Sequence, residues 1–379
     1  MPTTALAKTI RFKRACSDGQ RITVAAVGDL IFHNRLLRKA FHKKTGFTQF
    51  WRPVASVLRD ADLTYGNLEG PAAQGVAVGG RKIKDPGWRL DYRVYGYRLP
   101  SLLFNFHPAV IADLKRSGFD IVSTANNHAL DRGSVGIEQT IDNFDKAGLT
   151  YTGTRKTHDK SLNWSQVTRA KGLNIAWLAC TFSTNGIPDR KKQTLRCFKH
   201  KERILDEIRR LHVSKDVDAV ILTPHWGKEN SPHPTRRQRR LARTAIEAGA
   251  AAVLGAHPHV LQPWRKHTTA SGREGLIIYS LGNFVSNQRR LPQRIGTIAL
   301  IEFTRAKTGE AHITGAGYIP TWVAIDRRGI RVTEGQDKSR AARHALRILP
   351  AGNRVSMTHF RQFPKNCSTK LRSTKAHGH

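Results

Sequence analysis

The sequence predicts an α/β fold in which strands alternate with helices along most of the chain. Two observations support the α/β prediction. Short apolar runs that end at glycine or at polar clusters alternate with segments in which apolar residues recur at helical spacing. Several of these runs are followed directly by Asp, Glu, Asn or His. Ligands bind at the carboxyl ends of strands in open α/β sheets, so a functional site is expected at that edge.

Strand-like and helix-like segments alternate in the first half of the chain. The strand-like segments are 22–27, 61–65, 119–123 and 149–152. The helix-like segments are 50–60, 108–117 and 134–147, the last with Ser134 as its expected N-cap and Gly148 as its stop. Residues 74–100 are rich in Gly, Arg and Tyr, so we expect a long loop over the site.

The second half continues the alternation and then becomes rich in strands. Helices are expected at 201–212 and 235–248, and strands at 173–179, 217–223, 250–254, 276–280, 296–303 and 316–324. The late strands predict a second sheet packed on the first. We therefore divide the chain into a basic leader (1–20), one large domain (21–335) and a basic C-terminal tail (336–379).

The charge of the chain is unusual. Its 64 Lys and Arg against 28 Asp and Glu give a net charge of +36, which attracts a polyanionic substrate, an anionic membrane surface or nucleic acid without sequence specificity. Because the basic residues are spread along the whole chain and Arg dominates, a composition bias is the alternative explanation. The sequence indicates no oligomeric state.

Targeting signals are not evident. No apolar stretch approaches the ~20 residues needed to span a bilayer, and the N-terminus lacks the apolar core of a signal peptide. We expect a cytoplasmic protein whose membrane contact would be peripheral. The four cysteines (16, 180, 197 and 367) form no C-x-x-C pair, so reduced, buried thiols are expected.

Metal-ligand residue types follow five of the strand-like segments. Asp29, Glu69 and His225 each come at or just after such a run, and His257-Pro258-His259 follows another. A lone acid after a strand is more often a solvated turn residue. The histidine pair is a stronger signal, because the proline between the two residues stiffens the backbone and both imidazoles can face one cleft. Oxygen and imidazole ligands together suit one or two divalent ions such as Mn, Zn or Fe. Other histidines, including His33 and His233, lack this context and are expected at the surface.

The remaining strand-like run, 119–123, leads into A-N-N-H-A-L-D. Here Asn127 offers an amide oxygen to a metal, His128 is a candidate general acid, and Asp131 can fix the imidazole tautomer. An Asx-turn with a capping histidine is the structural alternative. The candidate substrate-binding residues are Asn67, Asn126, Asn283, Arg236 and Arg237. The last two belong to an arginine cluster that would form either a solvated helix face or an anion-binding rim.

These pieces together resemble the CapA-type capsule-synthesis (poly-γ-glutamate synthesis) family, which is similar to the calcineurin-like metallophosphoesterases. The matching pieces are V-G-D-L, D-L-T-Y-G-N-L-E, A-N-N-H-A-L-D-R-G, H-W-G-K-E, G-A-H-P-H-V-L-Q-P and Y-S-L-G-N-F. The resemblance implies a four-layer α/β/β/α sandwich with a metal centre at the strand ends. Its implied ligands are Asp29, Glu69, Asn127, His225, His257 and His259, with His128 as acid and Asp131 as its orienting partner.

Three functions are compatible with the sequence. The first is a metal-dependent hydrolase of metallophosphoesterase type, in which the metal activates water for attack on phosphorus or on an amide carbonyl. The second is a non-catalytic accessory protein that binds an anionic polymer during capsule or poly-γ-glutamate biosynthesis. The third, nucleic-acid binding, has only the charge in its favour, since no recognised binding module is present.

Overall fold

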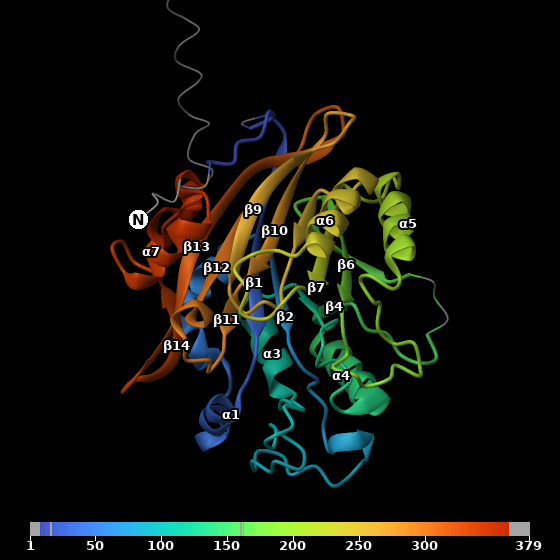
Figure 1. Ribbon diagram of the computed structural model, residues 1–379, viewed down its shortest axis with the longest axis vertical. Helices are drawn as coiled ribbons and strands as arrows, with labels where there is room; N and C mark the ends of the chain where they lie inside the picture. The colour runs from blue at the N-terminus through green and yellow to red at the C-terminus, as the bar shows by residue number, and fades with distance from the viewer. Residues whose placement is uncertain (1–7, 16, 160, 162, 364–379) are drawn as a thin grey trace, which may run out of the picture.

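The chain folds into two β-sheets packed face to face, with helices on both outer faces (Figure 1). The computed structural model describes residues 8–15, 17–159, 161 and 163–363. The predicted four-layer α/β/β/α arrangement is confirmed. Of the helices in this described part, none has the length and apolar character needed to cross a membrane.

The first sheet is centred on β1 (Gln20–Leu30). On one side of β1, β2 (Leu63–Leu68), β3 (Ile121–Ser123) and β4 (Thr150–Thr152) follow in parallel. On the other side lie the antiparallel strands β12 (Ile295–Arg305), β13 (Ala311–Asp326) and β14 (Gly329–Glu334). The short β11 (Asn283–Val285) pairs in parallel with the carboxyl end of β1.

The second sheet has the order β5-β6-β7-β8-β10-β9. Four strands are parallel: β6 (Leu173–Thr181), β7 (Ala219–His225), β8 (Ala252–Leu254) and β10 (Glu274–Leu281). The edge strands β5 (Ser165–Ala170) and β9 (Leu261–Thr268) are antiparallel to their neighbours. The late strands β12–β14 therefore extend the first sheet, and the prediction that they form the second one was wrong. Local pattern identifies a strand but does not encode its partner.

The core between the sheets is apolar and aromatic. Tyr65 of β2 and Trp177 of β6 stack across it with ring centroids 5.3 Å apart. Val24, Ile221 and Leu254 are fully or almost fully buried in the same cluster. Burial on this scale is the main favourable contribution to folding, since each large side chain removed from water contributes ~1.5–3 kcal/mol. It also holds the two sheets, and thus their carboxyl ends, in one relative position.

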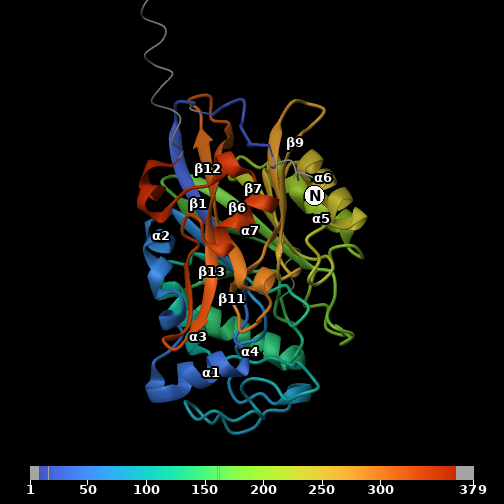
Figure 2. The ribbon, with the colours of Figure 1, turned by 60° about the vertical axis from the view of Figure 1, so that its left-hand side comes forward.

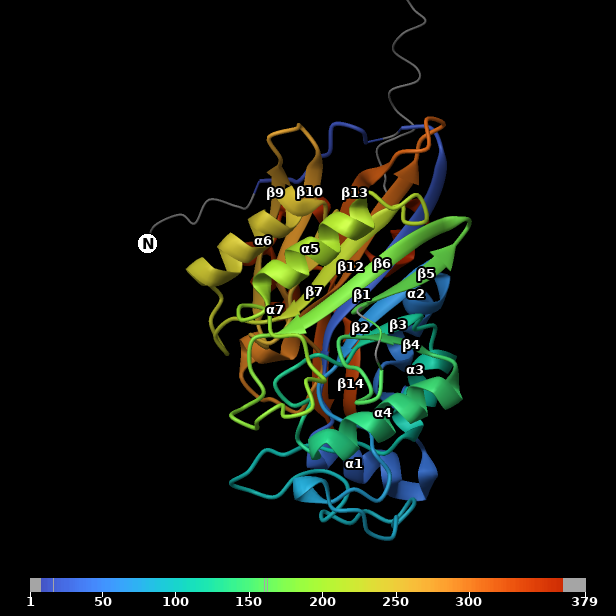
Figure 3. The same cartoon turned by 90° about the vertical axis from the view of Figure 1, so that its right-hand side faces the viewer.

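Helices cover the outer faces. The first sheet is covered by α1 (Asn34–Phe41), α2 (Ala55–Asp60), α3 (Ala109–Arg116) and α4 (Gly133–Ala147) (Figure 2). The second is covered by α5 (Lys201–His212) and α6 (Arg236–Ala248) (Figure 3), and α7 (Arg340–Ile348) packs on β9 and β13. Short 3-10 helices are His42–Lys44, Thr48–Phe50, Arg52–Val54, Val78–Gly80, Leu291–Arg294, Ala351–Asn353 and Met357–Gln362.

Two helix predictions need correction. The single helix expected at 50–60 is a 3-10 turn followed by the short α2, because Pro53 lies at the start of that turn and interrupts a regular helix. Ser134 is not an N-cap, since α4 begins at Gly133 with Arg132 in the capping position. Gly148 does end this helix, in the left-handed conformation at φ 61°.

The cysteine prediction was wrong for one pair. Cys180, near the end of β6, forms a disulfide with Cys197, and both side chains are fully buried. The chain leaves β6, makes a loop and returns beside the strand, where the backbone N–H of Cys197 donates to the carbonyl of Thr181 at 2.8 Å. The disulfide closes this loop, and disulfides persist mainly in oxidising compartments. Cys16 and Cys367 lie outside the described residues.

Candidate metal centre

The two sheets bring their carboxyl-terminal edges together, and the predicted ligands meet there. Asp29 is the next-to-last residue of β1, and Glu69 follows β2 directly. His225 is the last residue of β7, while His257 and His259 follow β8. All five side chains are almost completely buried, although up to 230 residues separate them in the sequence.

Three overlapping groups of side chains in the described structure could each hold a metal ion. They are Glu69, His225 and His257; Asp29, Glu69 and His259; and Glu229, His257 and His259. In each group one potential ligand atom per residue lies within 4.8 Å of the others. Glu69 Oε1 lies 3.4 Å from His225 Nε2 and 3.7 Å from His259 Nε2, so Glu69 belongs to both halves of the cluster. This geometry suits one ion or a close pair.

The cluster contains buried polar atoms that make no hydrogen bond within the described structure. Both carboxylate oxygens of Glu69, both ring nitrogens of His225, Nδ1 of His257 and Oδ1 of Asn127 are in this state. More than about 90% of buried polar groups in proteins are hydrogen-bonded, and each exception requires an explanation. Imidazole nitrogens, carboxylate oxygens and an amide oxygen are all metal donors, so a bound divalent ion would satisfy this set.

Burial keeps two of the imidazoles in the neutral form that binds metals. Burial lowers the pKa of His257 to about 3 and that of His225 well below its ordinary value, so both rings are neutral near pH 7. Neutral imidazole is the form that binds metals. Burial raises the pKa of Glu69 well above its usual range, and a cation in the cluster would favour its charged form.

His259 behaves differently because it faces carboxylates. Burial disfavours its charged form, but the Glu69 charge and the hydrogen bond with Asp29 outweigh burial and raise its pKa to about 9. Its Nδ1 lies 3.1 Å from Asp29 Oδ2 and 3.1 Å from Asn283 Oδ1. Nε2, on the Glu69 side, is the ring nitrogen left for a metal.

Asp29 organises the centre. Its carboxylate accepts hydrogen bonds from Asn67 Nδ2 at 2.8 Å and from the backbone N–H of His257 at 3.2 Å, in addition to its contact with His259. The histidine pair itself has an uncommon backbone. His257 and His259 have φ values of 95° and 58°, which non-glycine residues rarely adopt, and such backbone strain concentrates at functional sites.

His128 and Asp131 form the predicted pair beside the cluster. His128 Nδ1 lies 2.7 Å from Asp131 Oδ2, which also accepts from the backbone N–H of Phe104 at 2.6 Å. Burial raises the pKa of Asp131, while its contact with His128 opposes that shift. A carboxylate on Nδ1 fixes the ring orientation and leaves Nε2 for proton transfer.

The predicted substrate-binding asparagines are engaged with the protein. Asn67 donates to Asp29, and Asn126 donates to the carbonyl of Leu68 at 2.8 Å. Asn283 Nδ2 donates to Gln288 and to the carbonyl of Gln293. These amides therefore position metal-site residues and loops.

The predicted arginine rim lies on the exposed side of α6. Arg236 and Arg237 are exposed, and the Arg237 guanidinium lies 5.8 Å from the centre of the Phe198 ring. Both therefore lie on a solvated face of α6, which is one of the two alternatives for this arginine cluster. An anion-binding role for these arginines stays a prediction.

Sequence reasoning missed Glu229 in the centre and misplaced His33. Glu229 completes one of the candidate metal-binding groups, and its presence in H-W-G-K-E was an available signal. His33 was expected at the surface, but it is only partly exposed, and burial together with the charge of His259 lowers its pKa to about 4. Its Nδ1 accepts from the backbone N–H of Asn287 at 3.3 Å, so this surface prediction was wrong.

Two further residues hold loops around the centre. Arg132 is fully buried and donates to the carbonyls of Val76, Val94, Gly96 and Leu103, which ties down the long segment expected to cover the site. Asn185, in the loop closed by the disulfide, accepts from Asn127 Nδ2 at 3.2 Å. Phe182 of the same loop packs against the His257 ring, with centroids 4.6 Å apart.

Comparison with known proteins assigns the family. The family described as bacterial capsule synthesis protein PGA_cap matches residues 23–288, and the chain belongs to it. The chain is 28% identical over 276 residues to the capsule biosynthesis protein CapA of Bacillus anthracis, covering 72% of this chain and 61% of that protein. It is 26% identical over 294 residues to the PGA biosynthesis protein CapA of Bacillus subtilis (strain 168), covering 77% and 70%.

A solved structure is also similar. The NAD nucleotidase NadN of Haemophilus influenzae matches 86% of this chain and 62% of its own, with a TM-score of 0.44 and 11% sequence identity.

Proposed function

We propose that this protein is a metal-dependent hydrolase of metallophosphoesterase type that acts in capsule or poly-γ-glutamate biosynthesis. The observation that carries the proposal is the cluster of Asp29, Glu69, His225, His257 and His259, with buried donor atoms left unpartnered. A divalent ion bound there would supply Lewis-acid activation of a water and of the scissile bond. The substrate class is a phosphoester or an amide bond of an anionic polymer.

The residues beside the cluster have the arrangement for acid–base chemistry. His128 carries a proton donor or acceptor at Nε2, while Asp131 holds the opposite nitrogen. In its protonated form His128 would donate to the leaving group, and such a group contributes ~10²–10⁴-fold to rate. Asn127, adjacent in the chain, would direct its unpartnered Oδ1 to the metal.

The second candidate function is a non-catalytic accessory protein that binds an anionic polymer. The net charge of +36 favours it, since a positive field concentrates a polyanion at the surface. In that case the metal would stabilise the junction of the two sheets and have no chemical role.

One experiment separates the two candidates. The purified protein is stripped with a chelator, reloaded separately with Mn²⁺, Zn²⁺ or Fe²⁺, analysed for metal by mass spectrometry, and assayed on a generic phosphodiester and on a γ-glutamyl peptide. The hydrolase proposal expects stoichiometric metal and metal-dependent turnover of one substrate. Stoichiometric metal without turnover of either substrate would favour the accessory function, and absence of metal binding would contradict both uses of the centre.

A further inference from the structure

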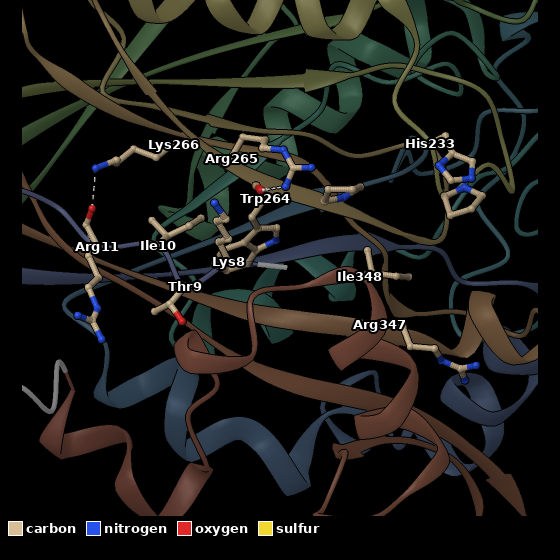
Figure 4. A pocket seen from close by; sticks show the side chains of 12 residues that line it. Lys8, Thr9, Ile10, Arg11, His233, Trp264, Arg265, Lys266, Arg347 and Ile348 are labelled. Carbon is tan, nitrogen blue, oxygen red and sulfur yellow. Dashed lines mark hydrogen bonds between the residues drawn. The ribbon is translucent and has the colours of Figure 1, made fainter. Parts of the chain in front are cut away.

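A strongly basic pocket shares no lining residue with the candidate metal-binding groups. It has a volume of about 720 Å³ and is enclosed by residues 8–11, the 232–233 segment, β9 and the end of α7 (Figure 4). Its cationic lining residues are Lys8, Arg11, Arg265, Lys266 and Arg347, with His233 at its edge. None of its described lining residues is acidic. A concave site with one sign of charge attracts an anionic ligand.

Most of these charges are available to a ligand. Lys266 is engaged, because its Nζ donates to Glu274 at 2.5 Å and to the backbone carbonyl of Arg11 at 2.8 Å. Across the described part of the chain, no ion pair involves Lys8, Arg11, Arg265 or Arg347. Unneutralised guanidinium groups facing one volume fit carboxylate or phosphate oxygens.

The pocket walls are held in place by the fold. Ile10 is fixed on both sides by Asn353, whose Oδ1 accepts from the Ile10 N–H at 2.7 Å and whose Nδ2 donates to the Ile10 carbonyl at 2.9 Å. Residues 8–11, which we had expected to form part of a loose leader, therefore form a wall. Trp264 also lines the pocket, and its buried indole N–H has no acceptor among the described residues. Because this N–H is buried, it belongs to the wall and is not a contact for a ligand.

The remaining lining residues favour a polycarboxylate over a nucleic acid. Ile10, Pro263 and Ile348 give the pocket an apolar component that suits the methylene groups of a carboxylate-bearing chain. Single-stranded nucleic acids are bound largely by stacking of bases on accessible aromatic rings. Among the described lining residues, Trp264 is the only aromatic ring besides the His233 imidazole, and it is only 1% exposed.

A single loop connects this pocket with the metal centre. Glu229, at one end of it, belongs to a candidate metal-binding group, whereas Pro232 and His233 line the basic pocket. The loop is fixed between the two sites, since the Asn230 N–H donates to the carbonyl of Pro258 at 2.8 Å. Gln262 Nε2 also donates to the Ser231 carbonyl at 2.9 Å.

We propose that the basic pocket binds carboxylates of an anionic polymer and holds the polymer near the metal centre. This inference deepens the proposed function and rests on it for the identity of the polymer as a substrate. Binding itself requires only the pocket. Arg265 on β9 and Arg347 on α7 are the principal contacts, because they come from different walls, are both exposed and form no ion pair among the described residues. Arg265 Nη1 donates to the Trp264 carbonyl at 3.1 Å, which leaves its other N–H groups for a ligand.

The test measures binding of fluorescently labelled poly-γ-glutamate by anisotropy. The pocket variant is R265Q/R347Q, and the matched control is R327Q/R328Q, which removes the same charge from the exposed turn between β13 and β14. We expect the pocket variant to bind about tenfold more weakly or worse, since charge-assisted hydrogen bonds from guanidinium groups to carboxylates are stronger than neutral ones. The control should bind as the wild type does.

Other outcomes would overturn the inference. Equal weakening in both variants would show that only the general field attracts the polymer. Equal affinity for single-stranded DNA of matched charge would contradict the carboxylate assignment. A third variant, His257→Ala, separates this inference from the proposed function. If it loses metal and turnover but binds the polymer normally, the two sites are distinct; if it alone loses polymer binding, the metal centre is the binding site and the pocket is not.

Discussion

Two kinds of buried histidine occur in this protein, and they differ in their partners. His257 in the metal centre and His107 beside α3 are both buried, and burial lowers their pKa to about 3 and about 4. His107 stacks on Trp88 with centroids 4.1 Å apart, and its Nδ1 accepts from the backbone N–H of Ala109 at 3.2 Å. Nδ1 of His257 has no such partner in the described structure.

The difference shows which observation distinguishes a ligand from a structural histidine. Burial and a lowered pKa are common to both residues, so neither property identifies a metal site. The feature that separates His257 from His107 is an unpartnered ring nitrogen that lies among other unpartnered nitrogen and oxygen atoms, because such a group lowers stability unless a ligand completes it. His107 is already satisfied by its own surroundings, and we expect no function for it beyond packing.

The largest expected effect is on metal affinity. His257→Ala removes a ligand, and we expect affinity to fall by more than ~100-fold, beyond the 10–100-fold typical of residues that only support ligands. His107→Phe, the matched control, should retain full metal content because its ring lies in an aromatic cluster with Phe41, Trp88 and Tyr95. Metal titration followed by mass spectrometry measures the metal affinity of both variants. An equal loss of affinity would contradict the assignment of His257 as a ligand and of His107 as a structural residue.

The next effect concerns His128, which has one engaged and one available nitrogen. His128→Ala should lower turnover by ~10²–10⁴-fold while metal content stays near that of the wild type. Asp131→Asn should have a smaller effect, since the ring remains. Steady-state kinetics with the metal-loaded protein provide the measurement, and loss of metal together with activity would assign His128 to the ligands instead.

Acidification should reveal His107 as a structural residue. Its pKa is lowered to about 4 in the fold, and the unfolded chain takes up the proton near pH 6.5. The unfolded state therefore binds more protons between these pH values. The contribution of neutral His107 to the free energy of unfolding is complete above pH 6.5 and is lost as the pH falls towards 4. Urea unfolding should show that the free energy of unfolding falls by roughly 1–3 kcal/mol over this pH range. The fall should be smaller in His107→Phe. An unchanged pH dependence in this variant would contradict the assignment.

The smallest expected effect is a gain in stability without metal. Glu69 is a buried carboxylate whose oxygens have no hydrogen-bond partner in the described structure. Glu69→Met keeps a similar volume and removes this cost, so the metal-free protein should gain on the order of 1 kcal/mol in unfolding free energy. The same substitution should abolish the metal-dependent stabilisation of the wild type. Thermal unfolding with and without chelator tests both, and lower stability in the metal-free variant would show that Glu69 is satisfied by the protein itself.

The sequence alone determined the parts of the site that depend on local pattern. Each apolar run predicted a strand, and polar residues directly after it predicted a ligand at the strand end. Asp29, Glu69, His225, His257 and His259 were all found in this way, and the structure brings them together. This succeeded because a parallel strand must deliver its following residues to one edge of the sheet.

Tertiary structure decided everything that depends on a distant partner. It assigned β12–β14 to the first sheet, paired Cys180 with Cys197, and placed Asn67 and Asn283 in contact with Asp29 and His259. The basic pocket joins residues 8–11 to α7, more than 300 positions away. The physical reason is common to these cases: spacing within a segment determines which side chains share a face, whereas packing between segments determines which faces meet.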